Sequence, residues 1–199
     1  MIREALERVK LVGFSMFAAI AYGIAHDMVT AHVCVEYFTI GHSNLLDEDP
    51  HGASPVLQAL LWGVLATWWV GAAAGVLISI VARAGPAPRL GVRDVVRPVL
   101  YVYCATALAA LMGGLLGASL AAGGAVAVGS RLARELPAET HVRFLADGWA
   151  HGAAYLMAVV AVLVLAGNLL GTRIRRVKEE STRDPLLGLP PARSDRGAE

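Results

Sequence analysis

The sequence predicts an all-α integral membrane protein, a bundle of four transmembrane helices. Of its 199 residues, 56% are hydrophobic and 17% are charged, whereas a soluble domain has about 25% charged residues. Four apolar stretches each reach the roughly 20 residues that a helix needs to cross the hydrocarbon core. These stretches are continuous and lack the alternation of a barrel strand. We therefore expect a multi-pass protein of the bacterial inner membrane.

The first helix is expected at about 11–37, directly after Lys10. The segment Ala19-Ile20-Ala21 resembles a signal-peptide cleavage site. However, Glu4 precedes the apolar run, and the helical pattern continues past the site, so we expect the segment to be retained as a helix. The other three helices are expected at about 56–82, 98–121 and 149–171.

These four helices form a single predicted domain, residues 1–178, because the connecting segments are too short for a second globular domain. The tail, residues 179–199, is charged and rich in proline and glycine, a composition typical of disorder. Glycines recur at a spacing of four, which lets helices approach closely within a bundle or at a dimer face. These pairs are Gly71 and Gly75, Gly113 and Gly117, and Gly167 and Gly171.

Loop charge predicts the orientation. All but three of the 17 lysines and arginines lie on the side of the N-terminus, and the exceptions are Arg131, Arg134 and Arg143. Lysine and arginine concentrate in cytoplasmic loops. Both termini are therefore expected in the cytoplasm, and all six histidines fall at or near the periplasmic face.

Two helical stripes carry the residues that could bind a ligand. His32 and Glu36 are four residues apart on the first helix, and Asp147 and His151 are four apart on the fourth. With a rise of about 1.5 Å per residue, both pairs reach the same depth near the periplasmic interface. If the stripes face each other, two imidazoles and two carboxylates converge, a set that suits Zn, Fe, Mn or Cu.

Two alternatives remain for these polar residues. His26 and Asp27 lie deeper in the first helix and could instead form a proton or ion relay. The whole cluster could also be structural, in a subunit that assembles with a larger membrane complex and has no site of its own. Haem needs two axial histidines at matched depth, for which His32 and His151 are a weaker candidate pair.

The run YGIAHDMVTAHVCVEYFTIGH, from Tyr22 to His42, resembles a signature of uncharacterised bacterial multi-pass membrane proteins. The resemblance covers about a tenth of the chain and implies no particular activity. The signature leaves position 32 open, which favours His26, Asp27, Glu36 and His42 over His32 as functional residues.

No sequence motif indicates a catalytic reaction or an organic cofactor. The chain lacks a nucleophile elbow, a P-loop and the H-E-x-x-H pattern of metalloproteases. The expected partners are the lipid bilayer and either a second copy of the chain or a larger membrane complex, with no nucleic acid. The sequence therefore predicts a metal- or proton-binding membrane protein and leaves the question of an enzyme open.

Overall fold

A computed structural model describes residues 1–47, 49–85 and 88–183, and this part is all-helical without strands. It confirms the predicted all-α fold, with four segments long and apolar enough to cross a bilayer. These are α1 (Ile2–Val33), the pair α3 (Pro55–Leu65) and α4 (Trp68–Arg83), α5 (Val92–Ala122), and α7 (His141–Arg183). The remaining elements are α2 (Glu36–Thr39), α6 (Leu132–Glu135) and η1 (Ala138–Thr140).

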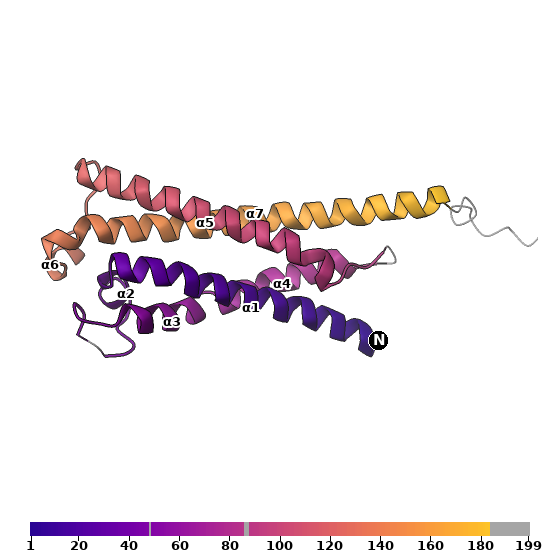
Figure 1. Cartoon of the computed structure of the whole chain (residues 1–199), viewed down its shortest axis with the longest axis horizontal. Helices are drawn as coiled ribbons and strands as arrows, with labels where there is room; N and C mark the ends of the chain where they lie inside the picture. Colours follow the sequence, from indigo (N-terminus) through magenta and orange to yellow (C-terminus); the bar gives the residue numbers. More distant parts are fainter. Residues whose placement is uncertain (48, 86–87, 184–199) are drawn as a thin grey trace, which may run out of the picture.

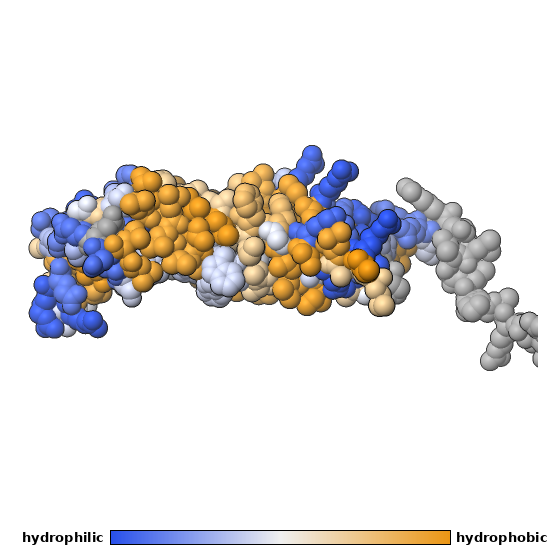
Figure 2. Space-filling view, turned by 90° about the horizontal axis from the view of Figure 1, so that it is seen from below, coloured by the Kyte–Doolittle hydropathy of each residue, from blue (hydrophilic) through white to orange (hydrophobic). Residues whose placement is uncertain are grey.

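The elongated molecule has the start of α1 and the end of α7 near one end and short helices at the other (Figure 1). The N-terminus and the end of α7 lie at one end, which we call the terminal end. The helices α2 and α6 lie at the other, which we call the loop end. Figure 2 shows a broad hydrophobic surface between hydrophilic ends, the pattern expected of a protein embedded in a bilayer.

Several helix bounds differ from the prediction. α1 ends at Val33 instead of 37, and the chain turns at Cys34, whose backbone is extended. α5 begins at Val92, where Asp94 accepts a hydrogen bond from the Gly91 backbone N–H at 2.9 Å and caps the helix. α7 continues to Arg183, so the first five residues of the predicted disordered tail are helical. The rest of that tail lies outside the described residues.

The helices form two halves with different internal packing. α1 packs along α3 and α4, and α5 packs along α7, with far fewer contacts between these halves. Glycines allow the close approach within each half. A Cβ added at Gly71 would lie 2.7 Å from the Met16 Cα of α1, and one added at Gly113 would lie 2.7 Å from the Trp149 carbonyl oxygen of α7.

The third glycine pair has a different environment. A Cβ added at Gly167 or Gly171 would meet no atom within 4 Å, so these glycines do not mediate a close helix contact in the single chain. The two halves are joined instead near the terminal end. An apolar cluster there includes Leu11 and Ile78 from one half and Val99 and Leu165 from the other. Toward the loop end the interface contains polar side chains.

Candidate metal centre

A hydrogen bond to the backbone of α7 orients His151, the first residue of the site. Its Nδ1 lies 2.8 Å from the backbone carbonyl oxygen of Asp147, one helical turn earlier. A carbonyl oxygen only accepts hydrogen bonds, so Nδ1 must carry the hydrogen. In a neutral imidazole the other nitrogen, Nε2, then presents a lone pair. The backbone of α7 thus fixes both the tautomer of His151 and the direction in which its free nitrogen points.

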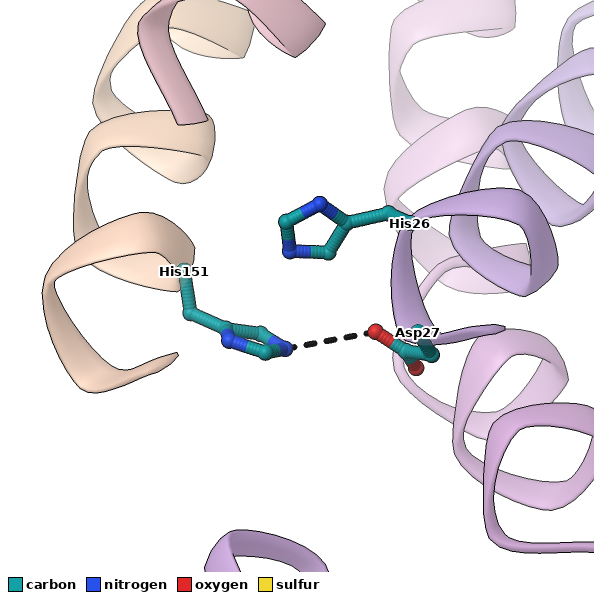
Figure 3. Close-up of side chains that lie close together, drawn as sticks. All are labelled: His26, Asp27 and His151. Carbon is teal, nitrogen blue, oxygen red and sulfur yellow. Dashed lines mark hydrogen bonds and ion pairs between the residues drawn. The ribbon is translucent and has the colours of Figure 1, made fainter. Parts of the chain in front are cut away.

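The free nitrogen of His151 points at Asp27 on α1. The distance from His151 Nε2 to Asp27 Oδ1 is 3.2 Å, and both side chains are buried (Figure 3). An unprotonated nitrogen and a carboxylate oxygen are both acceptors, so this contact is repulsive unless a proton or a cation lies between them. A proton or a cation between His151 and Asp27 would therefore stabilise this contact.

His26 completes the group from the neighbouring position on α1. One ligand atom from each of His26, Asp27 and His151 lies within 4.8 Å of the others. The Nε2 atom of His26 is buried without a hydrogen-bond partner. Figure 3 shows the His26 ring projecting into the space between the helices, above the contact between His151 and Asp27. Such a His/Asp group could hold a metal ion.

The contact between His151 and Asp27 has a length that suits a small divalent ion. Zn²⁺ binds imidazole nitrogen at about 2.0–2.1 Å and carboxylate oxygen at about 2.0–2.2 Å. Two such ligands on a tetrahedral ion lie about 3.3 Å apart, close to the 3.2 Å between His151 Nε2 and Asp27 Oδ1. Two imidazoles with one carboxylate leave a fourth position open, as in catalytic zinc sites.

Aromatic rings hold the imidazoles in place. Tyr37 stacks on His151 with ring centroids 4.6 Å apart, and Tyr22 stacks on His26 at 5.8 Å. The rings of His26 and His151 meet edge to face at 4.6 Å. Each ring is thus restrained by a neighbour as well as by its own helix. Fixed side chains lower the entropic cost of binding an ion.

The other predicted ligands lie apart from this group. His32 is exposed, and its Nδ1 is 2.7 Å from the Met28 carbonyl oxygen in its own helix. Glu36 lies on α2, where Oε1 is 3.6 Å from His51 Nδ1 and Oε2 is 3.3 Å from Cys34 Sγ. The predicted stripe of His32 and Glu36 is not formed, because α1 ends before Glu36.

Cys34 lies in the turn after α1, outside the four long helices. Burial, and next the hydrogen bond to Glu36, raise the pKa of the Cys34 thiol to about 12. It is therefore a protonated thiol at neutral pH and donates its hydrogen to Glu36. Asp147 is 2% exposed, and its Oδ2 atom has no hydrogen-bond partner, although its backbone carbonyl orients His151.

The sequence analysis considered the stripe of His32 and Glu36 opposite the stripe of Asp147 and His151. In the structure the residue of α1 that lies opposite His151 is Asp27, and His32 is exposed. A signal that Asp27 lies on a buried face was present in the sequence. Small residues recur every four positions before Asp27, at Ser15, Ala19 and Gly23, and all three are buried. Such a stripe marks the face of a membrane helix that packs against other helices.

Comparison with protein-family models, with curated proteins and with solved structures finds no match for the chain.

Proposed function

We propose that this membrane protein binds a divalent transition-metal ion between its two helical halves. One ring nitrogen of His26, the Nε2 of His151 and a carboxylate oxygen of Asp27 are the ligands. Imidazole nitrogen with carboxylate oxygen suits Zn²⁺, Fe²⁺ or Cu²⁺. The ion occupies the loop end of the bundle, which the distribution of lysine and arginine assigns to the periplasmic side. Both termini are then cytoplasmic, and the protein lies in the inner membrane.

The observation that carries this proposal is the set of three ligand atoms within 4.8 Å. A single proton between His151 and Asp27 would satisfy that pair, which is the basis of the alternative proton relay. It would leave the buried Nε2 of His26 without a partner. A metal ion satisfies all three groups at once, so the geometry favours the metal over the proton.

The ion also has a structural consequence. His26 and Asp27 belong to the half containing α1, and His151 belongs to the half containing α5 and α7. The halves have few contacts with each other apart from the apolar cluster near the terminal end. A bound ion therefore joins the halves at the loop end, and its binding energy contributes to their association.

Metal binding by untagged protein tests the proposal. The protein is purified in detergent, stripped with a chelator, titrated with Zn²⁺ by calorimetry and analysed for metal content. We expect one Zn²⁺ per chain. His151→Ala and Asp27→Ala each lower the affinity at least a hundredfold, because each removes a directly bound ligand.

His32→Ala is the matched control, because His32 is an exposed histidine on the same helix as His26, and its ring nitrogen already contacts the Met28 carbonyl. This variant keeps the wild-type affinity. Circular dichroism checks that each variant is folded. The proposal is wrong if folded wild-type protein binds Zn²⁺ no more tightly than His151→Ala, or if His32→Ala is as damaging as His151→Ala.

A further inference from the structure

A cavity between the two halves extends from the candidate metal centre to the loop end of the molecule. Its volume is about 860 Å³, part of which is open to the outside, and its wall is mostly apolar. His26, Asp27 and His151 all line it, so an ion bound to them would face this space. His42 lines it as well, although it lies in the segment after α2 and is exposed. One cavity therefore joins the buried ligands to a histidine at the surface.

The ring of His42 is oriented by a backbone carbonyl, as is the ring of His151. The Nδ1 atom of His42 lies 2.9 Å from the carbonyl oxygen of Tyr37. The carbonyl oxygen can only accept, so in a neutral imidazole Nδ1 carries the hydrogen and Nε2 presents a lone pair. Neutral imidazole is the commonest metal ligand in proteins. His42 therefore offers a metal-binding nitrogen outside the buried centre.

His42 lies one aromatic ring away from the centre. The ring of Tyr37 contacts both imidazoles, with its centroid 4.9 Å from that of His42 and 4.6 Å from that of His151. The ring of Phe38 also contacts both, at 6.4 Å from His42 and 5.8 Å from His151. His42 does not belong to the group of ligand atoms within 4.8 Å of one another. It is thus close to the centre without being one of its ligands.

A divalent ion needs such a ligand to enter a cavity with an apolar wall. An ion that leaves water loses part of its hydration shell, and an ion without ligands in apolar surroundings is strongly destabilised. A histidine at the surface replaces part of that shell before the ion reaches the buried ligands. We propose that His42 is an entry ligand, which captures the ion at the loop end and passes it through the cavity to the buried centre. This inference rests on the proposed metal centre and assigns the end from which the centre is loaded.

An entry ligand affects the rates of metal binding and leaves the equilibrium unchanged. Because His42 does not hold the ion in its final position, removing the imidazole raises the barrier between the free and the bound state. Association and dissociation then slow by the same factor, and Kd stays constant. The loss of a direct ligand has a different signature, since it weakens the affinity itself.

Stopped-flow association of Zn²⁺ with untagged, chelator-stripped protein in detergent tests this role. A fluorescent indicator of free Zn²⁺ follows the reaction, calorimetry gives the affinity, and circular dichroism checks folding. We expect His42→Ala to slow association about tenfold or more while Kd stays within about twofold of the wild type. His42→Phe keeps an aromatic ring against Tyr37 and Trp62 and removes only the nitrogen ligand, so it slows association to the same extent.

His32→Ala is the matched control. His32 is also exposed at the loop end, and its Nδ1 also lies near a backbone carbonyl oxygen, that of Met28 at 2.7 Å, but it does not line the cavity. This variant keeps the association rate of the wild type.

The role of His42 is overturned if His42→Ala and His42→Phe associate as fast as His32→Ala. It is also overturned if they lose affinity as His151→Ala does, because His42 would then be a direct ligand. Both outcomes are compatible with a metal centre in the protein. Absence of Zn²⁺ binding to the folded wild type would instead overturn the centre, and the entry role with it.

Discussion

Arg173 of α7 is expected to hold the two halves together at the terminal end. Its guanidinium reaches across to α4 and the segment that follows, with 2.7 Å from Nη1 to the Val81 carbonyl oxygen and 3.1 Å from Nε to that of Pro88. Nη2 also donates to the carbonyl oxygen of Ala84. The side chain is 5% exposed. The carbonyl groups of Val81 and Ala84 lie at the C-terminal end of α4, where a cation also interacts favourably with the helix dipole.

Arg173→Met keeps the approximate length of the side chain and removes these three hydrogen bonds. Each hydrogen bond to a charged group contributes about 1.5–3 kcal/mol, but such contributions are not additive. The loss is reduced further because a buried cation no longer has to be desolvated. We therefore expect a destabilisation of about 3–5 kcal/mol. The loss reaches the upper end of this range if no water molecule hydrogen-bonds to the carbonyl oxygens that Arg173 leaves.

Reversible unfolding of the detergent-purified protein with sodium dodecyl sulfate, followed by circular dichroism, measures this loss. Arg175→Met is the matched control, because Arg175 lies two residues away on the same helix and is exposed. We expect the control to change the unfolding free energy by less than about 0.5 kcal/mol. This role of Arg173 is refuted if the unfolding free energies of Arg173→Met and Arg175→Met differ by less than about 1 kcal/mol.

Two further predictions concern packing and orientation. Gly71→Ala costs about 1–3 kcal/mol, because its Cβ would lie 2.7 Å from the Met16 Cα, while Gly167→Ala, with no atom within 4 Å, costs nothing measurable in the same unfolding assay. A C-terminal green fluorescent protein fusion is fluorescent and an alkaline phosphatase fusion at the same site is inactive; the opposite pattern would place the C-terminus outside.

Length and composition were enough to predict the four membrane-spanning segments. A continuous apolar run of about 20 residues has few alternatives in a bilayer, since the backbone must satisfy its own hydrogen bonds there. Helix ends were harder to predict. Nothing in the composition of 34–37 marks a stop, yet α1 ends at Val33 and the chain turns at Cys34. Tertiary packing of the buried Cys34 and Phe38 accompanies that turn.

The candidate site was predicted in part. His151 and the pair His26 and Asp27 were identified as potential functional residues, and their approximate depth near one face of the membrane followed from helical rise. Their partnership could not be derived, because it depends on the rotation of α1 about its axis. The small residues Ala19 and Gly23 lie on the same stripe of α1 as Asp27, but they pack against α4 and α3 of their own half. They indicate that the stripe is buried and do not identify its partner on α7.

The tautomer of His151 depends on structure in the same way. It follows from a backbone contact of 2.8 Å to the Asp147 carbonyl, which a regular helix offers to a side chain four residues later only in certain rotamers. Sequence reasoning treated Asp147 as a ligand through its carboxylate. In the structure its backbone carbonyl orients His151, while its carboxylate oxygen Oδ2 is buried without a hydrogen-bond partner.

X-ray absorption at the zinc K-edge of untagged protein loaded with one equivalent of Zn²⁺ tests the metal centre most directly. The account predicts two imidazole nitrogens and one or two oxygens at about 2.0–2.2 Å, and one imidazole fewer in His26→Ala. A sulfur neighbour at about 2.3 Å, or a wild-type spectrum without imidazole scattering, would contradict the centre formed by His26, Asp27 and His151.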